Sequence, residues 1–166
     1  MKRCYCASGI LRYSFMGNKQ KNKEVGQLGE QIASKYLKNK GFIVLEQNYW
    51  KKWGEIDIVA SKVDDVTRET NTFSLRNALP ESMVHFIEVK TLSYESKAAL
   101  EAAVTHETWR PEEQVHQFKL HQIEKALETW ILEHSYTGNW QIDVISVRLV
   151  SEEKFAKVEF IENISN

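Results

Sequence analysis

Two short stretches of the chain each carry a pair of charged residues inside a β-rich run. The stretch WGEIDIVA contains Glu55 and Asp57, and the stretch VHFIEVKT contains Glu88 and Lys90. Because successive side chains of a strand point to opposite faces, each pair should share one face, with Ile56 and Ile58 together on the other. Buried charges are costly unless they pair or bind an ion. These charged pairs are therefore the first candidates for a functional site.

Two interpretations fit these pairs. A salt bridge between Glu88 and Lys90 on the wet face of a sheet would be purely structural, and a lone Glu-x-Lys triplet is common. Alternatively, Asp57 and Glu88 on adjacent strands converge on a hard divalent cation, which prefers oxygen ligands and keeps waters for a phosphate substrate. Lys90 would then lie beside the attacking water, where it can activate that water or offset charge in the transition state.

The elements that must position these residues begin with an amphipathic helix, predicted from about Glu24 to a stop at Gly41. Its apolar residues recur at helical spacing: Val25, Leu28, Ile32, Tyr36 and Leu37. At about 100° per residue, Glu30 falls on the border of the apolar stripe. That position can face a site at the edge of the core, although periodicity alone favours an ordinary glutamate at the rim.

The β-rich runs 42–50 and 53–60 are separated only by Lys51 and Lys52, which predicts a hairpin. The tip, YWKKW, interleaves aromatic residues with lysines and could stack unpaired bases and contact phosphates. A tip whose aromatic side chains pack inward is at least as good an interpretation. The runs NWQIDVISVRLV and KFAKVEFIENI predict two more strands, which complete a mixed sheet.

A second helix is predicted after Pro111, a natural residue for a first helical turn. Its apolar positions follow a 3.6-residue period: Val115, Ile123, Ala126 and Trp130. Lys119 lies in the middle of this apolar stripe. The usual explanation of such a lysine is snorkelling, in which the stem packs and the ammonium reaches the edge.

Composition sets the broad class of the protein. The chain has 166 residues with 42% hydrophobic content, which suits a single globular domain. The two cysteines, Cys4 and Cys6, both lie in the first six residues. The rest of the sequence therefore has no disulfide framework and no thiol metal site, which is typical of a protein in a reducing cytoplasm. A signal peptide, a membrane span and the fingerprints of zinc and nucleotide sites are not found. We expect a cytoplasmic protein that makes no membrane contact.

The formal net charge is only −1, so any affinity for nucleic acid must come from a local patch. The charges are distributed unevenly along the chain. Six basic residues precede the first acidic residue: Lys2, Arg3, Arg12, Lys19, Lys21 and Lys23. We expect residues 1–23 to form a basic, flexible arm and residues 24–166 to form one domain. A solvated tail without a role is the simpler interpretation of the arm.

The order of a helix, a hairpin that ends in an Asp strand, and a Glu-x-Lys strand resembles the PD-(D/E)xK nucleases. Their restriction-endonuclease-like fold is shared by archaeal Holliday junction resolvases. More closely, GQLGEQIASKYLKNKGF, NYWKKWGEIDIVA and FIEVKT resemble successive signatures of the YraN family, whose function is poorly defined and which is usually assigned to that superfamily. The resemblance covers roughly residues 24–163 and implies an α/β fold with a central mixed sheet flanked by helices.

Residue by residue, the resemblance implies that Asp57 and Glu88 bind the metal and that Lys90 is the catalytic lysine. It also implies that Glu30 joins the site, through the metal or its waters. Glu55 belongs to the same GEID motif, with a less clear role. The expected cofactor is Mg²⁺ or Mn²⁺.

The expected partner is DNA, and the resemblance implies that Lys119 contacts a phosphate near the site. Lys51 and Lys52 at the hairpin tip are the other candidates for phosphate contacts. The implied activity is metal-dependent hydrolysis of DNA phosphodiester bonds, at branched or junction structures. The alternative is a module on the nuclease fold that binds nucleic acid or a protein without cutting, and a homodimer is compatible with either.

One departure from the family pattern is the long link at 62–83, where the family usually has a short turn. It is either a flap that contacts the substrate or a tolerated insertion, and the second is the simpler interpretation.

Overall fold

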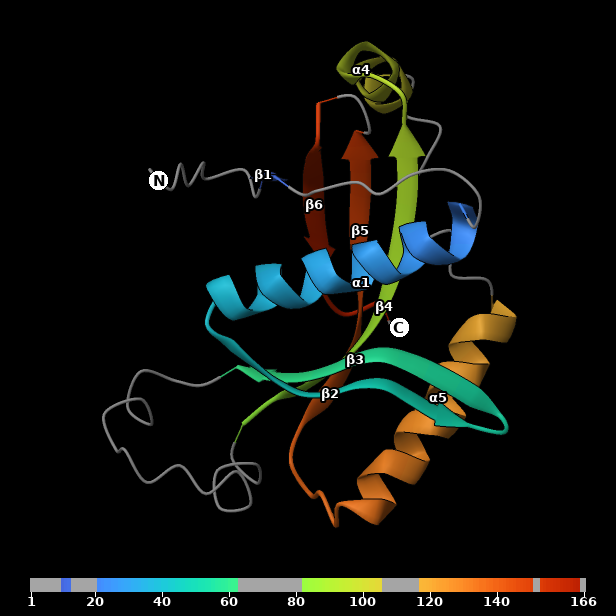
Figure 1. Ribbon diagram of the computed structural model, residues 1–166. Coiled ribbons are helices and arrows are strands. Elements are labelled where there is room, and N and C mark those ends of the chain that lie inside the picture. Colours follow the sequence, from blue (N-terminus) through green and yellow to red (C-terminus); the bar gives the residue numbers. More distant parts are fainter. Residues whose placement is uncertain (1–9, 13–20, 63–81, 106–116, 151–152, 165–166) are drawn as a thin grey trace.

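A computed structural model describes residues 10–12, 21–62, 82–105, 117–150 and 153–164 (Figure 1). The elements in these ranges are β1 (Ile10–Arg12), α1 (Lys21–Asn39), β2 (Phe42–Lys51), β3 (Gly54–Lys62), β4 (Val84–Tyr94), α4 (Lys97–Thr105), α5 (Gln117–Glu133), β5 (Trp140–Val150) and β6 (Phe155–Ile161). The predicted hairpin, the Glu-x-Lys strand and both C-terminal strands are confirmed.

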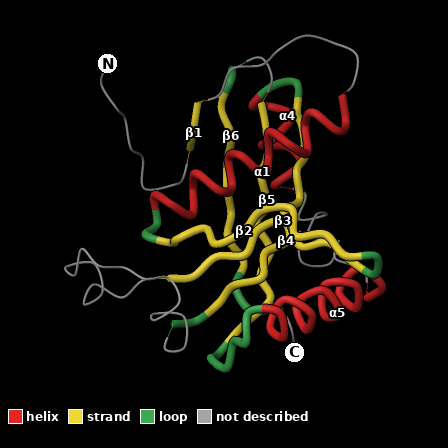
Figure 2. The backbone as a smooth tube through the Cα atoms, turned by 60° about the horizontal axis from the view of Figure 1, so that its bottom comes forward, coloured by secondary structure: helices red, strands yellow, loops and turns green. Residues whose placement is uncertain are grey.

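The strands form one sheet in the order β1-β6-β5-β4-β3-β2. Strands β4 and β5 are parallel, and the other described neighbours are antiparallel. Helix α1 crosses one face of the sheet, and α5 packs against the β2–β3 hairpin on the other side (Figures 1 and 2). The prediction of an α/β fold with a central mixed sheet flanked by helices is therefore confirmed.

Each helix buries its apolar stripe against one face of the sheet. On the α1 side, Ile32 and Leu37 pack with Ile87 of β4. On the α5 side, Ile123 and Trp130 join the cluster of Phe86, which precedes Ile87 in the chain. The alternation of Phe86 and Ile87 between the two clusters is that of a strand covered on both faces, and it fixes Glu88 on the α5 side, beyond Phe86.

Strand β3 departs from the predicted alternation at Asp57. Ile56 packs in the cluster under α5, whereas Ile58 packs in the cluster under α1, so the prediction that they share a face is wrong. Pairing between β3 and β4 runs from Ile58 to Ser61 only. The residues before Ile58 leave β4 and stay with β2, and the strand rotates where it separates. Asp57 lies at this point of separation.

Several predictions fall partly or wholly outside the described residues. Helix α1 begins at Lys21, slightly before the predicted start at Glu24, and residues 10–12 of the predicted arm pair with β6. The rest of the arm before α1, the link at 63–81 and the segment around Pro111 are not described.

Candidate active site

Asp57 is held where β3 separates from β4. The backbone N–H of Val89 on β4 donates to Oδ2 of Asp57 over 2.6 Å. The carboxylate thus takes the place of the backbone carbonyl that would have continued the β3–β4 ladder. This hydrogen bond fixes Asp57 next to Glu88, the residue before Val89.

The proximity of these two carboxylates is visible in the pKa of Asp57. Burial raises this pKa, and the negative charge of Glu88 raises it further. The Val89 N–H and the ammonium of Lys119 act in the opposite direction, but the net result is a pKa of about 7. Asp57 therefore shares a site with an acidic neighbour that disfavours its ionisation.

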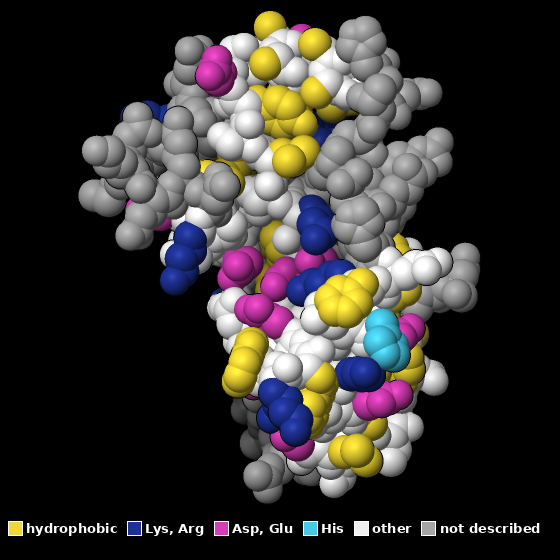
Figure 3. All heavy atoms as spheres, turned by 90° about the vertical axis from the view of Figure 1, so that its right-hand side faces the viewer, with side chains coloured by type: hydrophobic (Ala, Val, Ile, Leu, Met, Phe, Trp, Pro, Cys, Tyr) yellow, Lys and Arg dark blue, Asp and Glu magenta, His cyan; other side chains and the backbone are white. Residues whose placement is uncertain are grey.

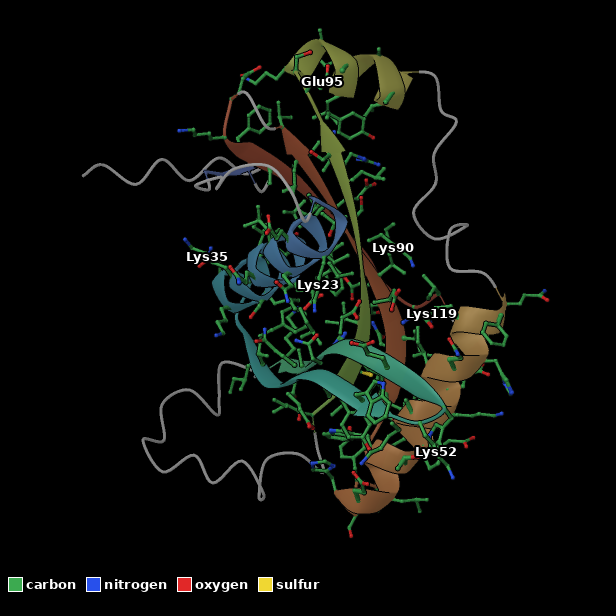
Figure 4. All side chains as sticks on the ribbon, turned by 45° about the vertical axis from the view of Figure 1, so that its right-hand side comes forward. Lys23, Lys35, Lys52, Lys90, Glu95 and Lys119 are labelled. Atoms are coloured by element: carbon green, nitrogen blue, oxygen red, sulfur yellow. The ribbon has the colours of Figure 1, made fainter. Side chains whose placement is uncertain are left out.

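Glu88 is buried, with 4% of its surface exposed, and two lysines converge on it. Nζ of Lys90 lies 2.9 Å from Oε1, and Nζ of Lys119 lies 3.0 Å from Oε2. Figure 4 shows the two lysines coming from different elements, Lys90 from β4 and Lys119 from the start of α5. The ammonium of Lys119 forms an ion pair with buried Oε2, to which no other described residue donates a hydrogen bond.

The structure thus places the ammonium of Lys119 at Glu88. Its Nζ also lies 3.4 Å from the backbone carbonyl oxygen of Glu55, to which it donates. Burial acts to lower the pKa of Lys119, but the charges of Glu88 and Asp57 outweigh burial, and the pKa is raised. Lys119 is therefore a firmly protonated cation beside the carboxylates.

Glu30 reaches the same region from α1, as the resemblance implied. Burial raises its pKa, the charges of Glu55 and Glu88 raise it further, and a hydrogen bond from the Asn48 side chain partly opposes them. Helix α1 can come this close because Gly29 has no side chain: a Cβ there would overlap the Thr91 side chain of β4. Figure 3 shows the resulting group of acidic side chains in a hollow, with basic side chains against them.

Glu30, Glu55, Asp57 and Glu88 are called the carboxylate cluster below. They come from α1, β3 and β4, and the charges of their neighbours in the cluster raise the pKa values of Glu30 and Asp57. Carboxylate oxygens, one of them buried without a hydrogen bond, suit a hard divalent cation. Within the described ranges, however, no three His, Cys, Asp or Glu side chains are already assembled as a metal-binding group. The carboxylate oxygens are of the type that Mg²⁺ and Mn²⁺ prefer as ligands. In this structure the carboxylate of Glu88 is paired with Lys90 and Lys119.

Two polar residues of the site were not predicted from the sequence. Asn48 of β2 has a φ of 52° and lies between the residues that pair with Ile56 and Ile58, so it stands opposite Asp57. Ser146 of β5 pairs with Lys90, and its buried hydroxyl has no hydrogen-bond partner among the residues that the structure describes. An asparagine inside a β-rich run was the available signal for the first, because asparagine tolerates the left-handed conformation.

Lys51 and Lys52 lie at the hairpin tip, away from the Glu88 lysines. Nζ of Lys51 is 2.6 Å from Oε1 of Glu133, at the far end of α5 from Lys119. Nζ of Lys52 lies over the ring of Trp53, 5.1 Å from its centroid. The structure therefore brings Lys119 to the carboxylate cluster but not these two lysines.

Some aromatic residues of the hairpin tip YWKKW pack inward, and one is exposed to solvent, where it could stack on a base. Tyr49 is buried, and the indole N–H of Trp53 donates to the Lys125 carbonyl and the Thr129 hydroxyl on α5. Trp50 is exposed instead. Most of the tip thus packs inward.

A family described as "Uncharacterised protein family UPF0102" matches residues 29–147 of the chain. The chain belongs to the UPF0102 family. Because UPF0102 is the YraN family, the resemblance seen in the sequence motifs is confirmed. The matched range of the UPF0102 family includes every residue of the carboxylate cluster, together with Lys90 and Lys119.

Individual UPF0102 proteins are similar over most of their length. A UPF0102 protein of Campylobacter fetus subsp. fetus (strain 82-40) is 34% identical, covering 84% of this chain and 92% of its own. One of Campylobacter jejuni subsp. jejuni (strain 81-176) is 31% identical with the same coverage. One of Alkaliphilus oremlandii is 32% identical, covering 86% of this chain and 97% of its own.

Among the described helices, none is both long and apolar enough to cross a membrane.

Proposed function

We propose that this UPF0102 protein hydrolyses phosphodiester bonds in DNA with the help of Mg²⁺ or Mn²⁺. The observation that carries the proposal is buried Glu88, which gathers Lys90 and Lys119 beside Asp57. Burying Glu88 beside three further acidic residues is costly for a purely structural pair, and a carboxyl whose pKa is strongly raised, as that of Asp57 is, is typical of functional sites. The resemblance to PD-(D/E)xK nucleases supports the same assignment.

Asp57, Glu88 and Glu30 are the residues that would hold the cation. When bound, a divalent cation neutralises phosphate charge and makes a water molecule a better nucleophile. Burial and the charge of Glu88 raise the pKa of Asp57 to about 7, and a bound cation would favour its ionised form, so that metal binding would release a proton.

The lysines act on the scissile phosphate itself. Lys90, whose ammonium is held 2.9 Å from Glu88, orients the attacking water and offsets the charge that develops on the phosphate oxygens. Lys119 contacts a phosphate oxygen from the other side, since the start of α5 places its ammonium at Oε2 of Glu88. Both lysines are oriented before substrate arrives, which is what electrostatic stabilisation of a transition state requires.

A second function is favoured by a specific observation. Glu88 is neutralised by two lysines, and no preassembled metal group occurs in the described part of the chain. In such a site the lysines balance the charge of Glu88 without a metal. This is expected of a module that binds DNA or a protein without cutting.

A cleavage assay separates the two functions. Linear, flapped and four-way DNA are incubated with the protein over a titration of Mg²⁺ and of Mn²⁺, and products are resolved on denaturing gels. Metal-dependent cleavage of at least one DNA is expected, and Lys90→Ala should reduce its rate about 100-fold or more. Lys35→Ala is the matched control, because Lys35 is exposed and lies away from Lys90 and Lys119 (Figure 4). Uncut DNA throughout, at micromolar protein, would favour the binding module.

A further inference from the structure

Two large aromatic side chains are exposed beside the carboxylate cluster. Trp50 is 68% exposed and Phe118 is 74% exposed. Aromatic rings contribute most to packing when buried, and single exposed ones need no explanation by themselves. The positions of these two relative to the site are therefore what matters.

Trp50 stands on the hairpin next to the cluster. In the β2–β3 register it pairs directly with Glu55, and directly paired residues share one face of a hairpin. Glu55 raises the pKa of Glu30 on α1, so this face of the hairpin looks toward the cluster. Tyr49, on the opposite face, is buried under α5.

Phe118 stands at the start of α5, next to the lysine that reaches the cluster. It directly precedes Lys119, whose ammonium lies 3.0 Å from Glu88. Neighbouring side chains of a helix diverge by about 100°, so Phe118 points outward while Lys119 points into the site. Figure 3 shows hydrophobic side chains at the surface beside the acidic group, with basic side chains close to them.

We propose that Trp50 and Phe118 stack on unpaired bases of DNA bound at the carboxylate cluster. This inference rests on the proposed function and narrows its substrate class to DNA with single-stranded nucleotides next to the scissile phosphate. The bases of a continuous duplex already stack on one another, whereas an unpaired base offers a free face to an aromatic ring. A net charge of −1 gives little general attraction to DNA, so local contacts of this kind must supply affinity.

The charges around the two rings fit the same ligand. Lys119 directly follows Phe118, and Lys52 lies two residues after Trp50 with its ammonium over the ring of Trp53. Each nucleotide of a single strand carries one base and one phosphate. An aromatic ring near a lysine can therefore stack on the base while the lysine contacts a phosphate.

The test is a binding measurement in which cleavage plays no part. Three labelled DNAs are compared by fluorescence anisotropy with Ca²⁺ in place of Mg²⁺: a duplex with a single-stranded flap, the same DNA with abasic sites in the flap, and the duplex without a flap. Trp50→Ala and Phe118→Ala should each weaken binding of the flapped DNA about tenfold and leave the other two nearly unchanged. Phe118→Tyr should retain binding, because a tyrosine ring also stacks.

Leu132→Ala is the matched control. Leu132 is 78% exposed on the same helix as Phe118 but near its other end, so its removal should change none of the three affinities. Equal losses on all three DNAs, or full affinity for the abasic flap, would overturn the inference. Base-dependent binding without cleavage in Mg²⁺ or Mn²⁺ would support the inference while contradicting the proposed hydrolysis.

Discussion

At the scale of single residues, Glu88 links the two lysines of the site. It is buried and lies within 3.0 Å of the ammonium groups of both Lys90 and Lys119. Removing its charge leaves two half-buried cations without their closest counter-charge. The same residue therefore serves stability in the metal-free protein and, in the proposed function, metal binding.

Glu88→Gln should consequently lower the free energy of unfolding in chelator, by about 1–3 kcal/mol once partial exposure of the lysines is allowed for. Urea denaturation followed by tryptophan fluorescence measures the change. Glu153→Gln provides the comparison, because the Lys97–Glu153 pair is exposed and should contribute almost nothing. Equal midpoints for wild type and Glu88→Gln would show that the two lysines do not depend on Glu88.

Asp57 gives the folded protein a distinctive dependence on pH. Its pKa is raised from 3.8 to about 7, mainly by burial and then by the charge of Glu88. Since the folded state holds this proton more tightly than the unfolded state, the corresponding stability is present below about pH 4 and is lost as pH rises through 7.

Asp57→Asn cannot ionise, yet its amide oxygen can still accept from Val89. In metal-free buffer it should match wild type near pH 4 and exceed it at pH 8, by at most about 4 kcal/mol. Chemical denaturation at a series of pH values measures the difference between the two proteins, in which other titrating groups largely cancel. A difference that does not grow with pH would contradict the raised pKa.

At the scale of elements, the approach of α1 to β4 decides whether Glu30 belongs to the site. The contact is made at Gly29, where any Cβ would overlap the side chain of Thr91. Gly26, one turn earlier on the same helix, has nothing within 4 Å of an added Cβ. The two glycines thus offer the same substitution with opposite consequences.

Gly29→Ala should push α1 away from β4, at a cost of about 1–3 kcal/mol from overpacking. Gly26→Ala should instead stabilise the protein by about 0.5–1 kcal/mol, because alanine is the better helix former. Thermal melts compare the two, and cleavage assays show whether moving α1 also reduces activity. A stable and fully active Gly29→Ala would mean that close packing of α1 is not needed to place Glu30.

Sequence patterns predicted the elements better than the places where those elements are irregular. Period-two and 3.6-residue patterns located the hairpin, β4 and α5, because buried faces impose those periods. Asp57 was identified as a site residue, but the rotation of β3 beside it was not. Which neighbour a strand leaves, and where, depends on the partner strands, and the residues of one strand alone do not encode it.

The site shows the same division between local and tertiary information. Asp57, Glu88, Lys90 and Glu30 were predicted from motif and resemblance, and the structure brings them together with Lys119. Asn48 was not predicted, because its role depends on lying opposite Asp57 and reaching Glu30 across two elements.

At the scale of the whole molecule, the proposed binding of DNA must occur despite a net charge near zero. Affinity for DNA should fall steeply with salt, since each lysine that contacts a phosphate releases counterions. Lys119→Met, which keeps the apolar stem, should flatten the plot of log affinity against log salt by about one unit. Lys51→Met should flatten it less, because Glu133 already pairs with Lys51. Identical slopes for wild type and Lys119→Met would leave Lys119 as a partner of Glu88 only.

Thermal melting tests whether the carboxylate cluster binds a divalent cation, and it can do so before any substrate is known. Wild type and Asp57→Asn are melted in chelator and in Mg²⁺ or Mn²⁺. At a hundredfold excess over its dissociation constant, the metal should stabilise wild type by about 2.7 kcal/mol and should have little effect on Asp57→Asn, which lacks a ligand charge. If wild type melts at the same temperature with and without either metal, the cluster is a structural ion network and the metal-dependent account is wrong.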